Sequence, residues 1–383
     1  MRSVGILGAG LSGVLMGMQL RRAGLDDFVI YEKQPDVGGT WLRNTYPGLH
    51  CDIPSHLYCY SFEPNPRWSM IYAGQAEIQA YLRGCAEKYG LLEHLCFDSC
   101  VETARFDEPS GTWNLEMADG QHHQHRVLVS ATGGLTEPRL PRIEGLDTFD
   151  GPLWHSGAWR DDVDLHGLRV AVVGSAASAV QVVPEVAKRA RQVVVYSRTP
   201  NWVMPRGNAP YSEDQQRALA SAPAMASTRR RQYREAMLWF GAFRRVDRAL
   251  GRLRELGQAN LRSAISDPGL IAALTPAYQP GCKRILVSDD YYPALALDHV
   301  QLVARGVAAL TTTGVVDTDG TETAVDAVIF CTGYRLGGRA DGRPAVDVFG
   351  SNGLNLRVSL AKGLRPIGVS PFPAFPTISL WLG

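Results

Sequence analysis

A glycine-rich stretch near the N-terminus constrains the fold of this chain more than any other feature. The apolar residues 3–7 run directly into GAGLSG at 8–13, apolar residues then recur at helical spacing to about Ala23, and the apolar run 28–31 ends at Glu32. Strand, GxGxxG loop, helix, strand and acid in this order form the fingerprint of a dinucleotide-binding βαβ unit. The alternative is a glycine-rich turn that holds no ligand.

Each position of the fingerprint has a physical reason. The first glycine permits a tight turn, the second lets the backbone approach a pyrophosphate, and the third lets the helix pack against the strand. The acid accepts hydrogen bonds from ribose hydroxyls, which suits FAD. The sequence therefore predicts a first cofactor site at Gly8, Gly10, Ser12, Gly13 and Glu32.

The same pattern recurs in the middle of the chain. A strand over 169–173 leads into GSAASA at 174–179, a helix to about Arg189 and a strand over 193–196. Here the strand ends in a basic residue, which suits the 2′-phosphate of NADP. The second glycine of the fingerprint is replaced by alanine, so a βαβ unit without cofactor remains the alternative. The predicted NADP site consists of Gly174, Ser175, Ala176, Ser178, Ala179, Ser197 and Arg198.

The remaining segments complete an α/β fold with two Rossmann-like domains. Apolar strands at 127–133 and 326–333 both end in Thr-Gly, a helix is expected around 78–89, and short alternating runs over 96–130 predict an antiparallel meander. Residues 212–274 are rich in Ala, Leu, Gln and Arg at helical spacing, which predicts a helical insertion with a solvated, arginine-rich face. Strands return at 285–287 and 300–303.

The bulk composition argues against several classes of partner. With 39 Lys+Arg and 38 Asp+Glu the net charge is +1, so there is no electrostatic reason to expect a nucleic-acid or bilayer partner. The N-terminus shows no signal peptide, and no apolar run approaches the ~18 residues of a membrane span. Seven cysteines without a CxxC predict reduced thiols and a cytoplasmic protein. The three histidines within 122–125 lack a cysteine or carboxylate at ligand spacing, so no metal site is expected.

Three longer motifs resemble one family. GGTWLRNTYPGLHCD at 38–52 fits the pattern [A/G]GxWxxxx[F/Y]PGxxxD, residues 149–159 fit FxGxxxHxxxW, and GCKRILVSDDYYPAL at 281–295 is similar to a nicotinamide-domain motif. In this combination the chain resembles the class B flavin-dependent monooxygenases, specifically the Baeyer–Villiger monooxygenases, over nearly its whole length. The resemblance implies FAD and NADPH as cofactors. It also implies that NADPH reduces FAD, that molecular oxygen adds to the reduced flavin, and that the resulting peroxide converts a ketone into an ester or lactone.

The resemblance also implies residue roles. Arg284 corresponds to the family's active-site arginine, Asp52 to the aspartate that holds it, and Lys283 to a ligand of the 2′-phosphate. A permanently charged guanidinium is suited to stabilising a peroxide anion. The remaining FAD-lining residues implied are Thr40, Trp41, Tyr58 and Val101.

Four departures keep alternatives open. Arg160 follows Trp159, as in N- and S-oxidising flavin monooxygenases, so heteroatom oxidation is the runner-up activity. Ala176 replaces a glycine, and His50 stands where many family members have an arginine. The family continues well beyond the position of Gly383, so an inactive nucleotide-binding remnant is the third interpretation.

The expected organisation is interleaved. We expect an FAD-binding domain at 1–145 that resumes, incompletely, at 336–383. An NADP-binding domain is expected at 146–207 and 281–335, with the helical insertion at 208–280. The expected partners are a small-molecule ketone and molecular oxygen. Neither the particular substrate nor the oligomeric state can be predicted.

Overall fold

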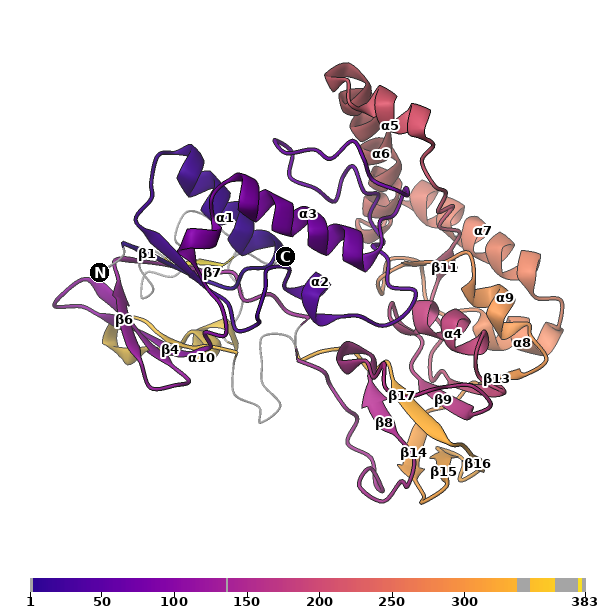
Figure 1. The fold of residues 1–383 in the computed structure, drawn as a ribbon. Helices are drawn as coiled ribbons and strands as arrows, with labels where there is room; N and C mark the ends of the chain where they lie inside the picture. Colours follow the sequence, from indigo (N-terminus) through magenta and orange to yellow (C-terminus); the bar gives the residue numbers. More distant parts are fainter. Residues whose placement is uncertain (1–2, 136, 336–344, 362–377, 381–383) are drawn as a thin grey trace. The chain divides into compact units, whose positions relative to one another are not determined.

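The computed structural model describes residues 3–135, 137–335, 345–361 and 378–380, and its chain divides into two units (Figure 1). Unit 1 comprises Met1–Arg43, Ala76–Pro138 and Tyr334–Gly383, and unit 2 comprises Asn44–Gln75 and Arg139–Gly333. The segment predicted as 1–145 is therefore shared: residues 44–75 and 139–145 belong to unit 2.

Unit 1 is built on a parallel sheet in the order β19-β7-β1-β2-β3. The strands are β1 (Val4–Leu7), β2 (Phe28–Tyr31), β3 (Leu95–Cys96), β7 (Val127–Ser130) and β19 (Ile378–Leu380). Helix α1 (Leu11–Arg22) connects β1 to β2, as the fingerprint predicts. In register, Val4 pairs with both Phe28 and Val127, so β1 is a central strand.

The sheet of unit 1 is covered by a helix and by a second sheet. Helix α1 packs on β1 and β2 (Figure 1). At Gly17 of this helix an added Cβ would lie 3.0 Å from Ile30 Cδ1. Helix α3 (Gln75–Lys88) confirms the helix expected at 78–89. The predicted meander is β4 (Val101–Asp107), β5 (Thr112–Met117) and β6 (His122–His125), extended by β18 (Asp347–Phe349). Trp113 and Leu115 of the meander are fully buried against Leu7 and Leu128.

Unit 2 contains the second parallel sheet, in the order β13-β10-β9-β17-β8. Its strands are β8 (Leu153–His155), β9 (Arg169–Val173), β10 (Gln192–Tyr196), β13 (Val300–Val303) and β17 (Ala327–Phe330). Alternate residues of one strand enter different cores: Val170 and Val172 join the cluster under α4 (Ala179–Ala187) and α9 (Tyr291–Leu295). Ala171 and Val173 join the cluster that contains Leu310 of β14 (Val307–Leu310) and Val315 of β15 (Gly314–Asp317). Strand β15 pairs in turn with β16 (Glu322–Ala324). Burial on both faces explains why residues 170–173 of β9 are all apolar.

The stretch predicted to be helical is helical. It forms α5 (Glu213–Leu219), α6 (Ala222–Phe243), α7 (Asp247–Ala264) and α8 (Pro268–Leu274). Ser212 begins α5 with a capping box to Gln215, and Asp267 caps α8 at Leu270. Helix α7 packs on β11 (Val203–Met204), which pairs in parallel with β12 (Leu286–Val287). Side chains of α6 and α7 form one apolar cluster with Met204 of β11 and Val287 of β12, the strands on either side of the helical stretch in the sequence.

Candidate active site

The first glycine loop, between β1 and α1, has no room for a side chain at its first and third glycines. Gly8 adopts φ +100°, and a Cβ there would lie 2.6 Å from the Ala131 carbonyl oxygen. A Cβ on Gly13 would lie 1.8 Å from the Gly8 carbonyl oxygen. The first and third glycines therefore bring the loop, the start of α1 and the end of β7 into direct backbone contact. Ser12 lies in the first turn of α1.

Glu32 fastens this loop to the end of β2. Its Oε2 accepts a hydrogen bond of 2.6 Å from the Ala9 amide, and its Oε1 accepts one of 2.9 Å from the Gln34 amide. Burial raises the pKa of Glu32, while the two backbone donors act in the opposite direction. Each carboxylate oxygen has a further lone pair, so the side chain can also accept from a ribose hydroxyl. The link to Ala9 is a structural role that the sequence did not predict.

Residues 38–41, the start of the GGTWLRNTYPGLHCD motif, lie against the same loop. The Gly38 amide donates to the Ala9 carbonyl at 3.0 Å, and a Cβ on Gly39 would lie 2.8 Å from Gly10 Cα. Thr40 and Trp41 follow in the short helix α2 (Thr40–Arg43), where Trp41 is buried. Val101, also predicted to bind the cofactor, is buried at the start of β4.

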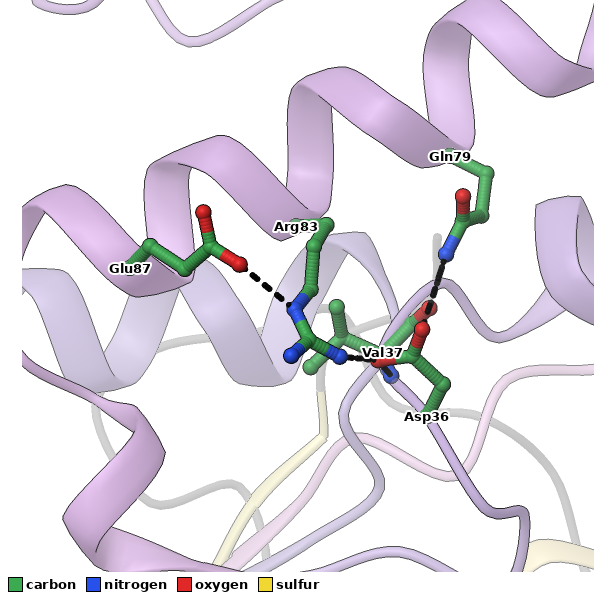
Figure 2. A network of polar contacts seen from close by, with 5 residues as sticks. All are labelled: Asp36, Val37, Gln79, Arg83 and Glu87. Carbon is green, nitrogen blue, oxygen red and sulfur yellow. Dashed lines mark hydrogen bonds and ion pairs between the residues drawn. The ribbon is translucent and has the colours of Figure 1, made fainter.

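Side chains of helix α3 contact residues 36 and 37, which precede this segment, as Figure 2 shows. Arg83 forms an ion pair with Asp36 and a 2.8 Å bond to Glu87 Oε1. Gln79 Nε2 donates to the Val37 carbonyl at 3.2 Å and to Asp36 Oδ2 at 3.3 Å. These contacts anchor residues 36–37, and thereby the backbone leading into Gly38.

The second glycine loop, in unit 2, repeats this close packing. Gly174 adopts φ +133°, and a Cβ there would lie 2.4 Å from the Cys331 carbonyl oxygen. Ser175 Oγ donates to the Thr199 carbonyl at 3.0 Å, and its own carbonyl accepts from Asn201 Nδ2 at 2.8 Å. Ala176 lies in the turn that leads through Ser178 to Ala179, the first residue of α4. At the end of β10, Ser197 is buried and Arg198 is exposed.

Asp52 and Arg284 form an ion pair within unit 2, although they are 232 residues apart. Arg284 donates to Asp52 Oδ2 from Nε at 2.9 Å and from Nη2 at 2.5 Å. Both bonds end on one carboxylate oxygen. The Arg284 side chain remains 64% exposed and the Asp52 side chain 29% exposed. The guanidinium is thus fixed at one edge and open to solvent at the other. Lys283 and Tyr58 belong to the same unit.

A further arginine near this pair was missed by the sequence analysis. Arg206 Nη2 donates to the Val287 carbonyl at 3.2 Å and to Gln181 Oε1 at 3.4 Å. Gln181 Oε1 also accepts from the His50 amide at 2.8 Å, which ties the segment containing Asp52 to α4. Burial lowers the pKa of Arg206, and Asp289, Asp290 and Asp52 oppose the shift. No sequence pattern marked this side chain, because its burial depends on contacts between distant segments.

The predicted site residues fall into two groups. Unit 1 brings together the first glycine loop, Glu32 and the helix carrying Thr40 and Trp41, with Val101 at the start of β4. Unit 2 contains the second glycine loop, Ser197 and Arg198, the Asp52–Arg284 pair, Lys283 and Tyr58. Across the described residues no group of three metal-ligating side chains occurs. In the same part of the chain no helix has the length and apolarity to cross a bilayer.

A glycine loop and an acid in one unit, with a glycine loop and an arginine in the other, define a protein with two nucleotide-binding units. The profile of the flavin-binding monooxygenase-like family matches residues 1–215. A Baeyer–Villiger monooxygenase of Streptomyces coelicolor is 40% identical over 99% of this chain and 73% of its own length. One of Pseudomonas aeruginosa is 38% identical over 99% of this chain and 72% of its own. The chain therefore belongs to the flavin-binding monooxygenases, among their Baeyer–Villiger members.

Solved structures agree with this assignment. An oxidised steroid monooxygenase bound to NADP superposes with a TM-score of 0.87 at 28% identity, over 98% of this chain and 79% of the other. A polycyclic ketone monooxygenase from the fungus Thermothelomyces thermophila has a TM-score of 0.83 at 29% identity, over 98% and 70%. The α/β fold with parallel, Rossmann-like sheets is thereby confirmed, and the chain is a flavin-dependent monooxygenase.

Proposed function

We propose that this chain uses FAD and NADPH to insert one oxygen atom from molecular oxygen next to a ketone carbonyl, which gives an ester or lactone. The observation that carries the proposal is the Asp52–Arg284 ion pair. It orients a permanently charged guanidinium through Nε and Nη2 and leaves the Arg284 side chain 64% exposed. The names of the relatives support the same reaction class.

The two units fit the two cofactors. In unit 1 the three glycines of the first loop leave backbone at the start of α1 to face a pyrophosphate, and Glu32 offers lone pairs to a ribose. We assign FAD to this unit and NADPH to unit 2, because an acid follows β2 and the basic Arg198 follows β10. The steroid monooxygenase of similar fold is bound to NADP. When bound, the flavin supplies hydride acceptance from NADPH and activation of molecular oxygen.

In this proposal, Arg284 stabilises negative charge that develops on oxygen during the reaction. A guanidinium remains protonated at every working pH, so it serves as a fixed cation without a proton-transfer step. Asp52 orients it through a single oxygen, which leaves Nη1 of Arg284 available to the reacting groups. Lys283 and Arg198 are assigned to the 2′-phosphate of NADPH, since both are exposed cations of unit 2.

The test is the Arg284→Ala variant, with Arg217→Ala as its matched control. Arg217 is an equally exposed arginine of unit 2, paired with Glu213 and Asp214 on α5. We expect Arg284→Ala to reduce bound flavin with NADPH at a nearly normal rate and to lose ester formation, by analogy with a lost oxyanion donor, ~10²–10³-fold or more. The control should retain both steps. Ester formation at the normal rate in Arg284→Ala would contradict the assigned role.

A mixed panel of ketones, amines and thioethers tests the alternative activity. Arg160, which raised the possibility of heteroatom oxidation, pairs with Asp162 at the surface through a 2.5 Å contact from Nη2. That contact gives Arg160 a local structural explanation, so we place ketone oxidation first. Oxidation of amines or thioethers without any ester product would reverse this order. Loss of flavin on desalting would support the interpretation as a nucleotide-binding remnant.

A further inference from the structure

Tyr278 connects the two parts of the proposed NADPH site. Lys283 Nζ lies over the Tyr278 ring, 4.8 Å from its centroid. A cation in this position is attracted by the negative face of the ring. An exposed lysine has four rotatable bonds in its stem, so a ring that attracts its ammonium group restricts where that group goes. The aromatic face therefore places the charge of Lys283.

The opposite end of the Tyr278 side chain is held at the second glycine loop. Its hydroxyl lies 3.0 Å from Asn201 Oδ1 and 3.1 Å from the Pro200 carbonyl oxygen, and donates to these acceptors. Asn201 in turn donates from Nδ2 to the Ser175 carbonyl at 2.8 Å and to Ser175 Oγ at 3.2 Å. Burial raises the pKa of Tyr278, so the phenol keeps its proton at neutral pH.

The backbone of Tyr278 is also fixed. Trp202 Nε1 donates to the Tyr278 carbonyl at 2.8 Å, and the tyrosine packs against the cluster of Trp202 and Ile285. Ser175 Oγ closes the chain of contacts by donating to the Thr199 carbonyl, next to Arg198. A continuous series of contacts thus runs from Lys283 through Tyr278 and Asn201 to Ser175.

We propose that Tyr278 is a positioning residue that sets the preference of this protein for a 2′-phosphorylated nucleotide, by holding Lys283 over its ring. This inference rests on the proposed assignment of Lys283 to the 2′-phosphate. The two ends of the side chain act differently. The ring acts on Lys283 and thus only on a ligand with a 2′-phosphate, whereas the hydroxyl acts on the Ser175 loop and thus on any nucleotide bound there.

The experiment measures binding of 2′,5′-ADP and 5′-AMP to the purified full chain by titration calorimetry. The readout is the ratio of the two affinities, which requires no turnover. A cation–π contact at an exposed site predicts that Tyr278→Leu lowers the ratio ~2–5-fold. Tyr278→Phe keeps the ring and should keep the ratio, while weakening both ligands together. Tyr233→Leu, at a tyrosine of α6 that is 60% exposed, is the matched control and should change neither affinity.

The Lys283→Ala variant tests the assignment of Lys283 to the 2′-phosphate separately from the role of Tyr278. We expect Lys283→Ala alone to lower the ratio, and Tyr278→Leu to have no further effect on the ratio in the Lys283→Ala background. An unchanged ratio in Tyr278→Leu, together with a lowered ratio in Lys283→Ala, would overturn the role of Tyr278 alone. A lower ratio in Tyr278→Phe would also overturn it, because the ring would then not be the active part. An unchanged ratio in Lys283→Ala would overturn the assignment of Lys283 itself.

Discussion

Two helical glycines of unit 1 should respond in opposite ways to the same substitution. Gly13 lies in α1, where an added Cβ would be 1.8 Å from the Gly8 carbonyl oxygen. Gly84 lies in α3, is exposed, and an added Cβ would meet nothing within 4 Å. Alanine is favoured over glycine by about 0.5–1 kcal/mol in a helix, so Gly84→Ala should stabilise the protein by that amount.

The expected effect at Gly13 has the opposite sign. An ordinary contact between carbon and a carbonyl oxygen is about 3.3 Å, so Gly13→Ala requires α1 and the Gly8 loop to separate by ~1.5 Å. Forced displacements of this kind destabilise by about 1–3 kcal/mol, which outweighs the gain in helix propensity. Because the gain in helix propensity is common to both sites, we expect the two variants to differ by about 1–3 kcal/mol in the free energy of unfolding.

The assay is urea denaturation of the flavin-free chain followed by circular dichroism, together with the dissociation constant for FAD. Gly13→Ala should bind FAD at least ~10-fold more weakly, because the backbone that would face the pyrophosphate has moved. Gly84→Ala should bind FAD normally. If both variants were equally stable and bound FAD equally well, the close packing of the loop would not be the constraint proposed here.

Two further predictions concern unit 2. Arg198→Ala should raise the KM for NADPH ~10-fold while leaving that for NADH nearly unchanged, since a charged hydrogen bond to phosphate is worth about 1.5–3 kcal/mol; equal effects in steady-state assays would exclude Arg198 as a reader of the 2′-phosphate. Burial lowers the pKa of His155 to about 4, so the unfolded chain binds more protons than the folded chain below pH ~6.5, and stability falls as the pH falls toward 4. His155→Asn should remove up to about 3 kcal/mol of this pH dependence, whereas the control His166→Asn, at an exposed histidine, should leave it in place. Thermal melts between pH 4 and 7 measure the difference. Burial lowers the pKa of His56 to about 4 as well, so His56 accounts for part of the pH dependence that remains in His155→Asn.

The strands and helices were predictable where apolar periodicity and glycine punctuation agreed. The strands at 28–31 and 169–173 have the predicted bounds, and the helix and meander of unit 1 lie where the pattern placed them. These elements bury continuous or alternating apolar faces, and that burial leaves a local trace in the sequence. The pairing of Asp52 with Arg284 was expected from motif resemblance alone, since no local pattern links residues so far apart.

Contacts between distant segments could not be predicted, because they leave no local pattern in the sequence. The membership of residues 44–75 in unit 2 depends on contacts such as that of the His50 amide with Gln181 Oε1, which no local pattern of residues predicts. The burial of Arg206 is likewise decided by distant segments. The bonds of Glu32 to the Ala9 and Gln34 amides could not be predicted, because an acid at the end of a strand is equally compatible with an exposed side chain.

The assignment of residues 44–75 to unit 2 restricts how this protein can be recombined with its relatives. Asp52 lies in 44–75 and Arg284 in 139–333. The two partners of the ion pair are therefore separated in the sequence by residues 76–138 of unit 1. A chimaera that exchanges only 139–333 would combine an arginine from one parent with an aspartate from another, and a foreign Gln181 with the native His50 backbone. Crossovers placed at 43/44, 75/76, 138/139 and 333/334 would keep both contacts within one parent. The support of the Arg284 guanidinium by Asp52 is therefore expected to be inherited only when both gene segments come from the same parent.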